Sequence, residues 1–231
     1  MRRARGHPQG WLRLVHRLRP HRVLRMNSMP AGFASELIQA RCTVLPKRLA
    51  EPGPDARQLA QILEAAAAAP DHGELVPWRF VIVPAHARAA LADTFEGALV
   101  ERDATATAQQ RQQAREKAFR APLLLLAIAR LGGDDGNVPP TERFVSAGCA
   151  IQNMLLMATA QGFGSALTSG KALQSPLLRA LFALKAHEQA LCFLSIGTAS
   201  ARKPRRPRPA AQRYVSTLAV PVGPSCNPGN A

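Results

Sequence analysis

The sequence predicts an α+β fold, in which helices pack against a central sheet. Short apolar runs at residues 79–84, 122–130 and 190–198 are typical of strands that are covered on both faces. The stretches between them place apolar residues three and four positions apart, which is the spacing of one helix face. The sequence shows neither an internal repeat nor a second domain, and this mixture of elements favours one layered domain.

The first half of the chain carries clear start and stop signals. We expect a short helix at 34–40, a connector at 41–54, a helix from Asp55 to about Pro70, a strand at 79–84 and two helices within 86–118. Asp55 is followed three residues later by Gln58, which is typical of a capping box. Pro70 ends this helix, because the residue before a proline disfavours the helical conformation.

The second half continues with strands and one long helix. We expect a strand at 122–130, a loop at 132–140, a helix at 141–161, a turn and short strand at 162–170, a helix from Ser175-Pro176 and a strand at 190–198. The apolar stripe of the long helix consists of Phe144, Ala147, Gly148, Ile151, Met154, Leu155 and Ala158. Its small residues, Ala147, Gly148 and Ala150, suit close packing, either of a partner subunit or inside one subunit.

The net charge of +15 is concentrated at the two ends of the chain. Residues 1–35 contain eight arginines and residues 199–231 contain six Lys or Arg, and neither segment has an acid. A nucleic-acid-binding protein needs its cations clustered on the folded body. The nearly neutral body therefore predicts no nucleic-acid partner. A non-enzymatic binder of nucleic acid or membrane through the basic ends is the alternative.

Residues 1–33 are expected to be an extension of the domain at 34–218, with a tail at 219–231. Apolar residues within 11–18 alternate with arginines, so a basic amphipathic helix on a membrane or a targeting signal is one interpretation. A disordered segment is another. A third is translation that starts at Met26 or Met29.

The four cysteines, Cys42, Cys149, Cys192 and Cys226, lie far apart and form no CxxC pair. This spacing argues against a zinc site or a disulfide framework and predicts reduced thiols in a cytoplasmic protein. No apolar run approaches the roughly 20 residues that cross a bilayer, so we expect no membrane partner. The chain also lacks a GxGxxG after a strand, a Walker loop, HExxH and GxSxG.

Two loops near the N-terminal half contain residues suited to a binding site. Arg41-Cys42-Thr43 brings a guanidinium and a hydroxyl together, which suits a phosphate or a polar ring edge. The loop at 69–78 contains His72, which we expect at the mouth of the sheet, or else as a loop histidine with a backbone partner. Trp78 is expected to be a packing anchor.

A third, glycine-rich loop follows the long helix at 161–170. Glycines let a backbone approach a flat ligand closely. Thr168 and Ser169 can hydrogen-bond the ligand's edges. The alternative for Gly162 is a helix C-cap followed by a turn.

In this order and spacing, these segments resemble the nitroreductase family, and most closely its compact YdjA-like branch. The matching segments are Arg41–Thr43, residues 47–52, 69–72 with Pro77-Trp78, 119–122, 146–150, 161–164 and Gly197-Thr198, within about residues 34–218. The resemblance implies an α+β fold with a central, mostly antiparallel sheet. It also implies an intertwined homodimer with FMN at the subunit interface.

The resemblance assigns cofactor contacts by position. Flavin contacts match Arg41, Cys42, Thr43, Ala68, His72, Leu167, Thr168 and Ser169. The segment assigned to the nicotinamide nucleotide matches Met157, Ala158, Thr159, Ala160, Gln161 and Gly162. Lys203, Arg205 and Arg206 lie where many members hold the flavin phosphate with a cation. The resemblance implies no catalytic side chain and no metal ligand.

The chain departs from the family pattern at several of these positions. Cys42 replaces the second Arg of the first motif, and Leu167 and Thr168 replace an aromatic and a basic residue of the close branch. Glu74 and Val76 stand where the wider family has Asn and Gln. These changes concern the choice of nucleotide and substrate more than the flavin.

The implied activity is transfer of hydride from NAD(P)H through FMN to a nitro, quinone or similar acceptor. The cofactor carries such chemistry, while the protein supplies position and electrostatics. Backbone donors and Arg41 would stabilise negative charge on the reduced ring. The same fold with a different flavin reaction, such as dehalogenation, desaturation or flavin destruction, is the alternative.

Overall fold

The structure, a computed structural model, describes residues 31–133, 137–201 and 207–219. The expectations for residues 1–30, for Cys226 and for Lys203, Arg205 and Arg206 lie outside the described residues. The helices within these ranges include α2 (Ala31–Ala40), α3 (Ala56–Ala65), α4 (Arg88–Arg102), α5 (Ala108–Glu116), α6 (Pro140–Ala160) and α7 (Pro176–Leu181). The strands are β1 (Leu49–Ala50), β2 (Trp78–Ile82), β3 (Leu123–Arg130), β4 (Gly164–Thr168) and β5 (Glu188–Ala199).

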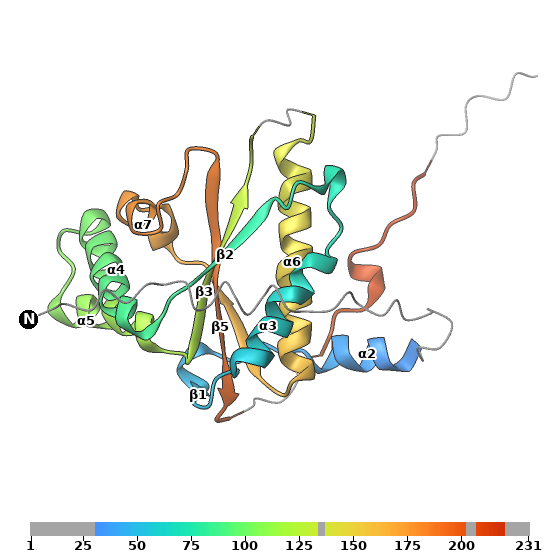
Figure 1. The fold of residues 1–231 in the computed structure, drawn as a ribbon, viewed down its shortest axis with the longest axis horizontal. Coiled ribbons are helices and arrows are strands. Elements are labelled where there is room, and N and C mark those ends of the chain that lie inside the picture. The colour runs from blue at the N-terminus through green and yellow to red at the C-terminus, as the bar shows by residue number, and fades with distance from the viewer. Residues whose placement is uncertain (1–30, 134–136, 202–206, 220–231) are drawn as a thin grey trace, which may run out of the picture.

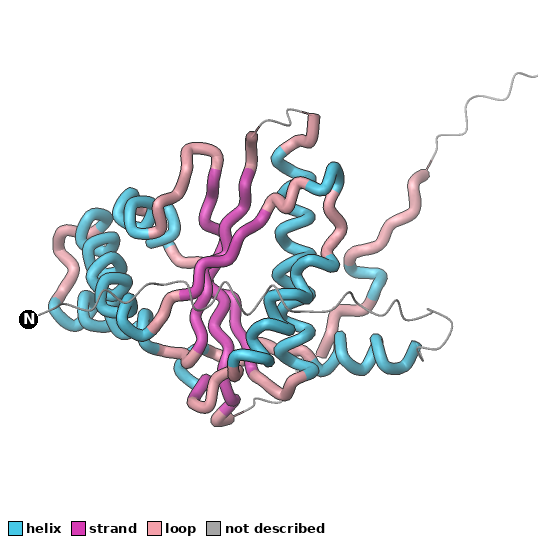
Figure 2. Tube along the Cα trace, in the orientation of Figure 1, coloured by secondary structure: helices cyan, strands magenta, loops and turns pink. Residues whose placement is uncertain are grey.

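Helices cover both faces of one central sheet (Figures 1 and 2). α3 and α6 lie on one face, and α4, α5 and α7 lie on the other. Because side chains alternate between the two faces of a strand, β3 contributes to two separate cores. Leu125 belongs to the core that contains Ile62 and Met154, whereas Leu126 belongs to the core that contains Leu91. The predicted α+β class is confirmed.

All pairings between the strands named above are antiparallel. Their order is β1-β5-β3-β2, and β4 also pairs with β5. β5 pairs with β3 along one edge and with β4 along the other, and β1 pairs with the last residues of β5. β4 therefore lies at the border of the sheet, where an isolated parallel bridge joins Thr43 to Ser165. The expected, mostly antiparallel sheet is confirmed.

Two of the predicted helix starts are confirmed by their hydrogen bonds. The Asp55 side chain accepts from the backbone N–H of Gln58 (2.8 Å), and the Gln58 side chain accepts from the N–H of Asp55 (2.9 Å). Ser175 caps α7 by accepting from the N–H of Leu177 (3.1 Å), and Pro176 occupies the first turn. In both cases the cap satisfies backbone donors that the helix itself leaves unpaired.

The structure corrects the expected connector at 41–54, because part of it joins the sheet. Leu49 pairs with Ala199 and Ala50 pairs with Thr198, which forms β1. A strand of two residues has no alternating pattern to detect in the sequence. Its pairing depends on β5, which is about 150 residues later in the sequence but adjacent in the sheet.

α6 begins and ends one residue earlier than predicted. Most of its expected apolar stripe is buried, but the placement of Gly148 on that face was wrong. Gly148 is exposed, and a Cβ built there would meet nothing within 4 Å. Arg143 and Ser146 are buried in its place. Within the described ranges, no helix is long and apolar enough to span a bilayer.

The small residues of α6 therefore have separate environments. Ala147 and Ala150 are fully buried among α3 and sheet residues of the same chain, which supports close packing inside one subunit. Gly148 and the exposed Val145 lie on the outer side of the helix. This outer side of α6 is exposed and can meet another chain.

Candidate functional site

The loop after α2 runs beside the border strand β4. The backbone N–H of Val44 donates to the carbonyl of Ser165 (2.9 Å), and Thr43 forms the parallel bridge with the same residue. This contact brings the Arg41–Thr43 loop against the glycine-rich loop, although they are far apart in the sequence. Two of the three predicted loops thus meet.

The outer edge of β4 continues past this bridge. In a strand, the backbone N–H and C=O groups of alternate residues point to the same side. Since Ser165 points its carbonyl outward to Val44, Leu167 presents its own N–H and C=O to the same edge. Among the described residues, no strand pairs with Leu167 on that side. Unpaired backbone groups at a sheet edge are ready to bind a polar partner.

A cavity of ≈ 630 Å³ lies at this edge, and we call it the loop cavity. Its walls come from α2, the 41–43 loop, α6, β4 and the 207–214 segment, and include Ile38, Arg41, Thr43, Leu155, Leu167 and Arg208. Nη2 of Arg208 donates to the backbone carbonyl of Arg41 (2.9 Å), which ties the C-terminal segment to the loop. Among the described lining residues there is no Asp or Glu. The loop cavity is therefore suited to an anion.

Cys42 stands in the sequence between Arg41 and Thr43, which both line the loop cavity, but Cys42 itself does not line it. Its half-buried side chain packs against the small apolar cluster of Val44, Leu49 and Ala121. Its side chain therefore contributes to this apolar cluster. The predicted flavin contact at Cys42 remains a prediction.

A second cavity of ≈ 1000 Å³ lies between the α4–α5 pair and the 167–173 segment, and we call it the helix cavity. Thr168 and Ser169, both predicted as flavin contacts, line this cavity. Four cationic side chains also line it: Arg102, Lys117, Arg120 and Lys171. Leu167 lines both cavities, so the two spaces adjoin at the end of β4.

The sheet register explains the floor of the helix cavity. Leu124 of β3 pairs with Ser195 of β5, and Phe193 of β5 pairs with Thr168 of β4. Residues paired across strands point to the same face of the sheet. These four side chains therefore face α4, and all four line the cavity.

His72 lies away from both cavities, beside the first turn of α6. Its Nδ1 is 2.8 Å from Oε2 of Glu142. A rise of 1.5 Å per residue puts about 20 Å between Glu142 and Leu155, the α6 residue of the loop cavity. Ala68 is exposed in the 3-10 turn Ala66–Ala68, which packs on α6. Within one chain, neither residue lines the loop cavity.

The Met157–Gly162 segment forms the end of α6. The N–H of Gly162 donates to the carbonyl of Thr159 (3.0 Å), and the N–H of Phe163 donates to that of Ala158 (2.9 Å). With Gly162 at φ +86°, these bonds form a Schellman motif. The alternative of a helix C-cap at Gly162 is therefore confirmed.

Two side chains of this segment, those of Ala158 and Gln161, pack against the rest of the chain. Ala158 is fully buried, and Gln161 Nε2 donates to the carbonyl of Gln58 (3.3 Å) and to Oε1 of Gln61 (2.9 Å). Oε1 of Gln161 is buried and has no hydrogen-bond partner among the described residues. A nucleotide contact by this segment remains a prediction.

Gly164 has a packing role. A Cβ at Gly164 would lie 2.9 Å from Leu49 Cδ2, 3.0 Å from Val44 Cγ2 and 3.2 Å from Ala199 Cβ. The absence of a side chain at Gly164 lets β4 pack closely against Leu49 of β1 and Val44 of the first loop. Gly170, in contrast, faces open space at the helix cavity.

Several lining residues were missed by the sequence analysis. Arg208 stands two residues after the predicted phosphate-binding cations, so the basic tail was a partial signal for it. The cations of the helix cavity come from three separate parts of the chain. No local motif contains them, and only the folded structure brings them together. Among the described residues, no group of three or more His, Cys, Asp or Glu could hold a metal.

Solved structures share this arrangement of sheet and helices. A nitroreductase-like family protein from Bacillus cereus aligns with a TM-score of 0.70 at 18% identity, over 84% of this chain and 98% of the other. A mutant of the FMN- and NADPH-dependent nitroreductase NfnB from Sphigopyxis sp. strain HMH aligns with a TM-score of 0.64 at 21% identity, over 81% and 99%. At these identities the likeness defines the fold class, that of the nitroreductase-like proteins.

Sequence comparison identifies the family itself. The model of the nitroreductase family matches residues 47–198. Escherichia coli (strain K12) YdjA, whose name places it among the NAD(P)H nitroreductases, is 37% identical over 154 residues, which cover 65% of this chain and 81% of YdjA. The chain therefore belongs to the nitroreductase family, a family of oxidoreductases.

Proposed function

We propose that this protein binds FMN in the loop cavity and transfers hydride from NAD(P)H to a nitro, quinone or similar acceptor. The observation that carries the proposal is the convergence of Arg41, Thr43 and Arg208 with the free edge of β4 in one cavity. Membership of the nitroreductase family supports it. The name of the structural relative NfnB, which is FMN- and NADPH-dependent, supports the choice of cofactors.

The size and chemistry of the loop cavity fit this cofactor. Its ≈ 630 Å³ falls within the roughly 300–1,000 Å³ typical of ligand and cofactor sites. The walls combine apolar side chains, such as Ile38 and Leu155, with the guanidinium groups of Arg41 and Arg208. FMN needs both, because its ring has apolar faces and its phosphate carries about −1.5 to −2 charges at pH 7.

The residues of the cavity have distinct tasks in this proposal. Arg41 and Arg208 hold the phosphate, because the planar guanidinium matches phosphate oxygens in two parallel hydrogen bonds. The hydroxyl of Thr43 can donate or accept a hydrogen bond, and the N–H and C=O of Leu167 meet the polar edge of a ring. When bound, the flavin supplies the two-electron chemistry by accepting hydride from the nicotinamide ring and passing it to the acceptor.

We further propose that two copies of the chain form each site. His72 and Arg41 match flavin contacts of the family, yet His72 lies beside the opposite end of α6 from the loop cavity. Both residues can serve one flavin only if His72 comes from a second copy. This arrangement places the cofactor at the interface of a homodimer.

The distribution of exposed apolar side chains supports the dimer. Phe33, Ile38, Val145, Tyr214, Val215 and Leu218 are all more than half exposed. They lie on α2, on the outer side of α6 and in the 207–219 segment. α2 and the 207–219 segment extend from α6 on the side away from the sheet (Figure 1). Exposed apolar patches of this kind mark protein–protein contacts. A second copy of the chain that packs on this apolar surface would also reach the loop cavity, because Ile38 and Tyr214 belong to both.

The visible absorption spectrum tests the flavin proposal. The purified protein should be yellow or become yellow with added FMN, bleach with anaerobic NADPH or NADH, and regain its colour with a quinone. An Arg41→Gln variant should retain less FMN while keeping the circular dichroism of the parent. Protein that stays colourless after incubation with FMN contradicts the proposal.

Mixed dimers test the shared site. Arg41→Gln and His72→Ala subunits carrying different affinity tags should each lose flavin as homodimers. Their heterodimer contains one site with both native residues and one site with both substitutions, so it should recover about half of the parental flavin content. A heterodimer as poor in flavin as the two homodimers shows that one copy supplies both residues. A monomer in sedimentation experiments also excludes the shared site.

A further inference from the structure

The cations of the helix cavity have no protein partners in the described part of the chain. The side chains of Arg102, Lys117, Arg120 and Lys171 form no ion pair or hydrogen bond with any described residue, and no Asp or Glu is among the described lining residues. A neighbouring cation outside the cavity behaves differently, because Arg115 of α5 pairs with Asp93 (2.6 Å) and Glu96 (2.7 Å). The charge of the helix cavity is therefore left uncompensated.

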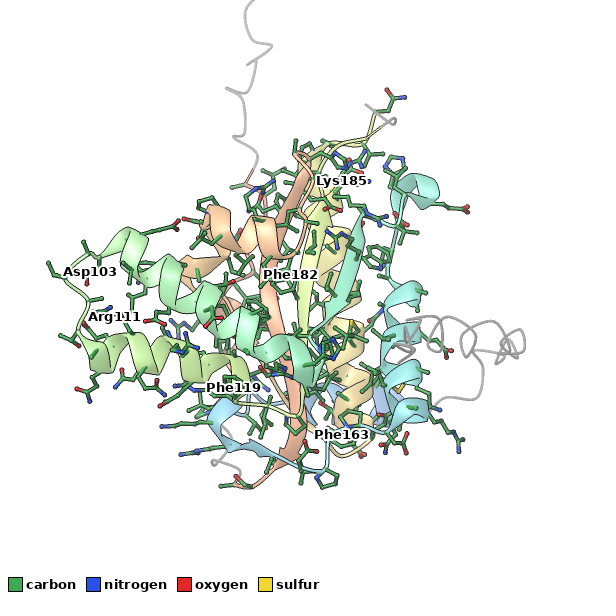
Figure 3. The ribbon with its side chains drawn as sticks, turned by 60° about the vertical axis from the view of Figure 1, so that its left-hand side comes forward. Asp103, Arg111, Phe119, Phe163, Phe182 and Lys185 are labelled. Atoms are coloured by element: carbon green, nitrogen blue, oxygen red, sulfur yellow. The ribbon has the colours of Figure 1, made fainter. Side chains whose placement is uncertain are left out.

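The rim and the floor of the helix cavity differ in character. The floor contains Phe95 and Phe193, whose rings meet edge to face with centroids 5.5 Å apart. Figure 3 shows α4 and α5 side by side, with Asp103 at the turn that joins them and Phe119 at the other end of the pair. The cations come from α4, from the stretch after α5 and from the 3-10 turn Lys171–Gln174. The cavity thus combines an apolar, partly aromatic floor with positive charges from several directions.

The helix cavity also lies beside the proposed flavin site. Leu167 lines both cavities, and Thr168 and Ser169 continue from it along the helix cavity. A ligand in the helix cavity can therefore extend to the end of β4, where the loop cavity begins. A hydride donor needs this proximity, since hydride passes only between groups in contact.

We propose that the helix cavity binds the phosphate groups of the nicotinamide dinucleotide, and that the 2′-phosphate makes NADPH the preferred donor. The role of the dinucleotide as hydride donor rests on the proposed function, but its binding can be measured without flavin. Arg102, Lys117, Arg120 and Lys171 pair with the diphosphate and the 2′-phosphate, while the floor takes the apolar face of a ring.

Charge and size favour a dinucleotide over other occupants. A 2′-phosphate adds about −1.5 to −2 charges to the two of the diphosphate, which matches four cations. The ≈ 1000 Å³ of the helix cavity is at the upper limit of the roughly 300–1,000 Å³ found for ligand sites, which is more than a small acceptor needs. The chain's own ends are basic and would be repelled by the same cations.

Calorimetric titration of the protein with NADP⁺ and NAD⁺ tests the proposal. We expect NADP⁺ to bind about tenfold more tightly, and the difference to shrink as salt rises, because exposed charges are screened over about 10 Å at 0.1 M. A double Arg102→Gln, Arg120→Gln variant should weaken NADP⁺ binding about tenfold and bring it near that of NAD⁺. A double Lys117→Gln, Lys171→Gln variant should also weaken NADP⁺ binding.

Lys185→Gln is a control for the loss of positive charge, because it removes one exposed cation that does not line the cavity. Figure 3 shows Lys185 near the top of the view, well above Phe119, and Lys185 does not line the helix cavity. This variant should bind NADP⁺ as the parent does. An equal loss in the control means that total charge, and not the helix cavity, sets the affinity, and this result overturns the proposal.

The remaining outcomes separate this proposal from the flavin proposal. Selective NADP⁺ binding by protein that takes up no FMN supports the helix cavity and rejects the flavin site. Flavin-loaded protein whose NADP⁺ and NAD⁺ affinities are equal, and unchanged by the double variant, rejects the helix cavity alone. Loss of NADP⁺ binding in Gln161→Ala but not in the double variant assigns the nucleotide to the end of α6 instead.

Discussion

Arg208 donates a hydrogen bond from Nη2 to the backbone carbonyl of Arg41, with 2.9 Å between the two atoms. This contact ties the C-terminal segment to the loop cavity. The other nitrogen atoms of the Arg208 guanidinium have no partner among the described residues, so they can bind an anion. The loop after the first described helix and the last described segment thus share one site. Arg208 therefore supplies the cavity with a second cation from a part of the sequence far from Arg41.

Arg208→Gln should weaken FMN retention about tenfold, because it removes a charge and the forked donor together. The measurement is fluorescence titration of flavin-free protein with FMN. Riboflavin, which lacks the phosphate, should bind the parent and the variant alike. Arg213→Gln removes a cation from the same segment outside the loop cavity, so it should leave the FMN affinity unchanged. Equal losses in both variants would contradict a specific role for Arg208.

Replacement of Arg88 should destabilise the fold without affecting ligand binding directly. The buried guanidinium donates to the carbonyls of Val83 (2.9 Å), Ala118 (2.6 Å) and Pro122 (3.1 Å), which joins the ends of three segments. Arg88→Met leaves these acceptors without their donor and should lower the free energy of unfolding by about 3 kcal/mol. Urea denaturation measures this loss. Arg88→Lys, which retains a charge but not the fork, should fall between parent and Met variant.

The elements that the sequence predicted well are those with local signals. The capping box of Asp55 and Gln58 marks a helix start by chemistry that spans four residues. The run at 122–130 is apolar throughout because β3 lies in the middle of the sheet with both faces covered. β1 was missed because its two residues become a strand only through pairing with β5. Such a pairing depends on the completed fold and leaves no local pattern.

The candidate site divides in the same way. Arg41, Thr43 and Leu167 were found because the resemblance places them in recognisable motifs, and the structure brings them to one cavity. The position of His72 was not predictable, since its distance from Arg41 depends on how the chain runs along α6. The helix cavity was invisible in the sequence, because its cations become neighbours only after α4, α5 and β4 have packed together.

The ion pair between Arg79 and Glu188 predicts a pH-dependent loss of stability in acid. Glu188 is almost fully buried and accepts from Nε and Nη2 of Arg79 (both 2.7 Å). The hydrogen bonds from Arg79 lower the pKa of Glu188 to about 2, even though burial alone would raise it. The pKa of an unfolded glutamate is about 4.3, so the stabilisation is complete above that value and is lost as the pH falls towards 2.

Glu188→Gln should therefore be less stable than the parent near pH 7, and the difference should shrink between about pH 4 and pH 2. Thermal unfolding across this pH range measures both effects. Glu116→Gln, at an exposed position at the end of α5, should follow the parent at each pH. A difference between parent and Glu188→Gln that stays constant down to pH 2 would show that the pair does not lower the pKa of Glu188.

The three cysteines of the described residues should differ in reactivity because they differ in burial. Burial raises the pKa of Cys192 to about 11, whereas Cys42 and Cys149 are only half buried. At pH 8 about one Cys192 in a thousand is then a thiolate, the form that reacts with thiol reagents. In a Cys226→Ser background, mass spectrometry after labelling with iodoacetamide should find Cys192 modified last in the folded protein. In urea all three should react at similar rates, which provides the control, and early labelling of Cys192 in the native state would contradict its place in the core.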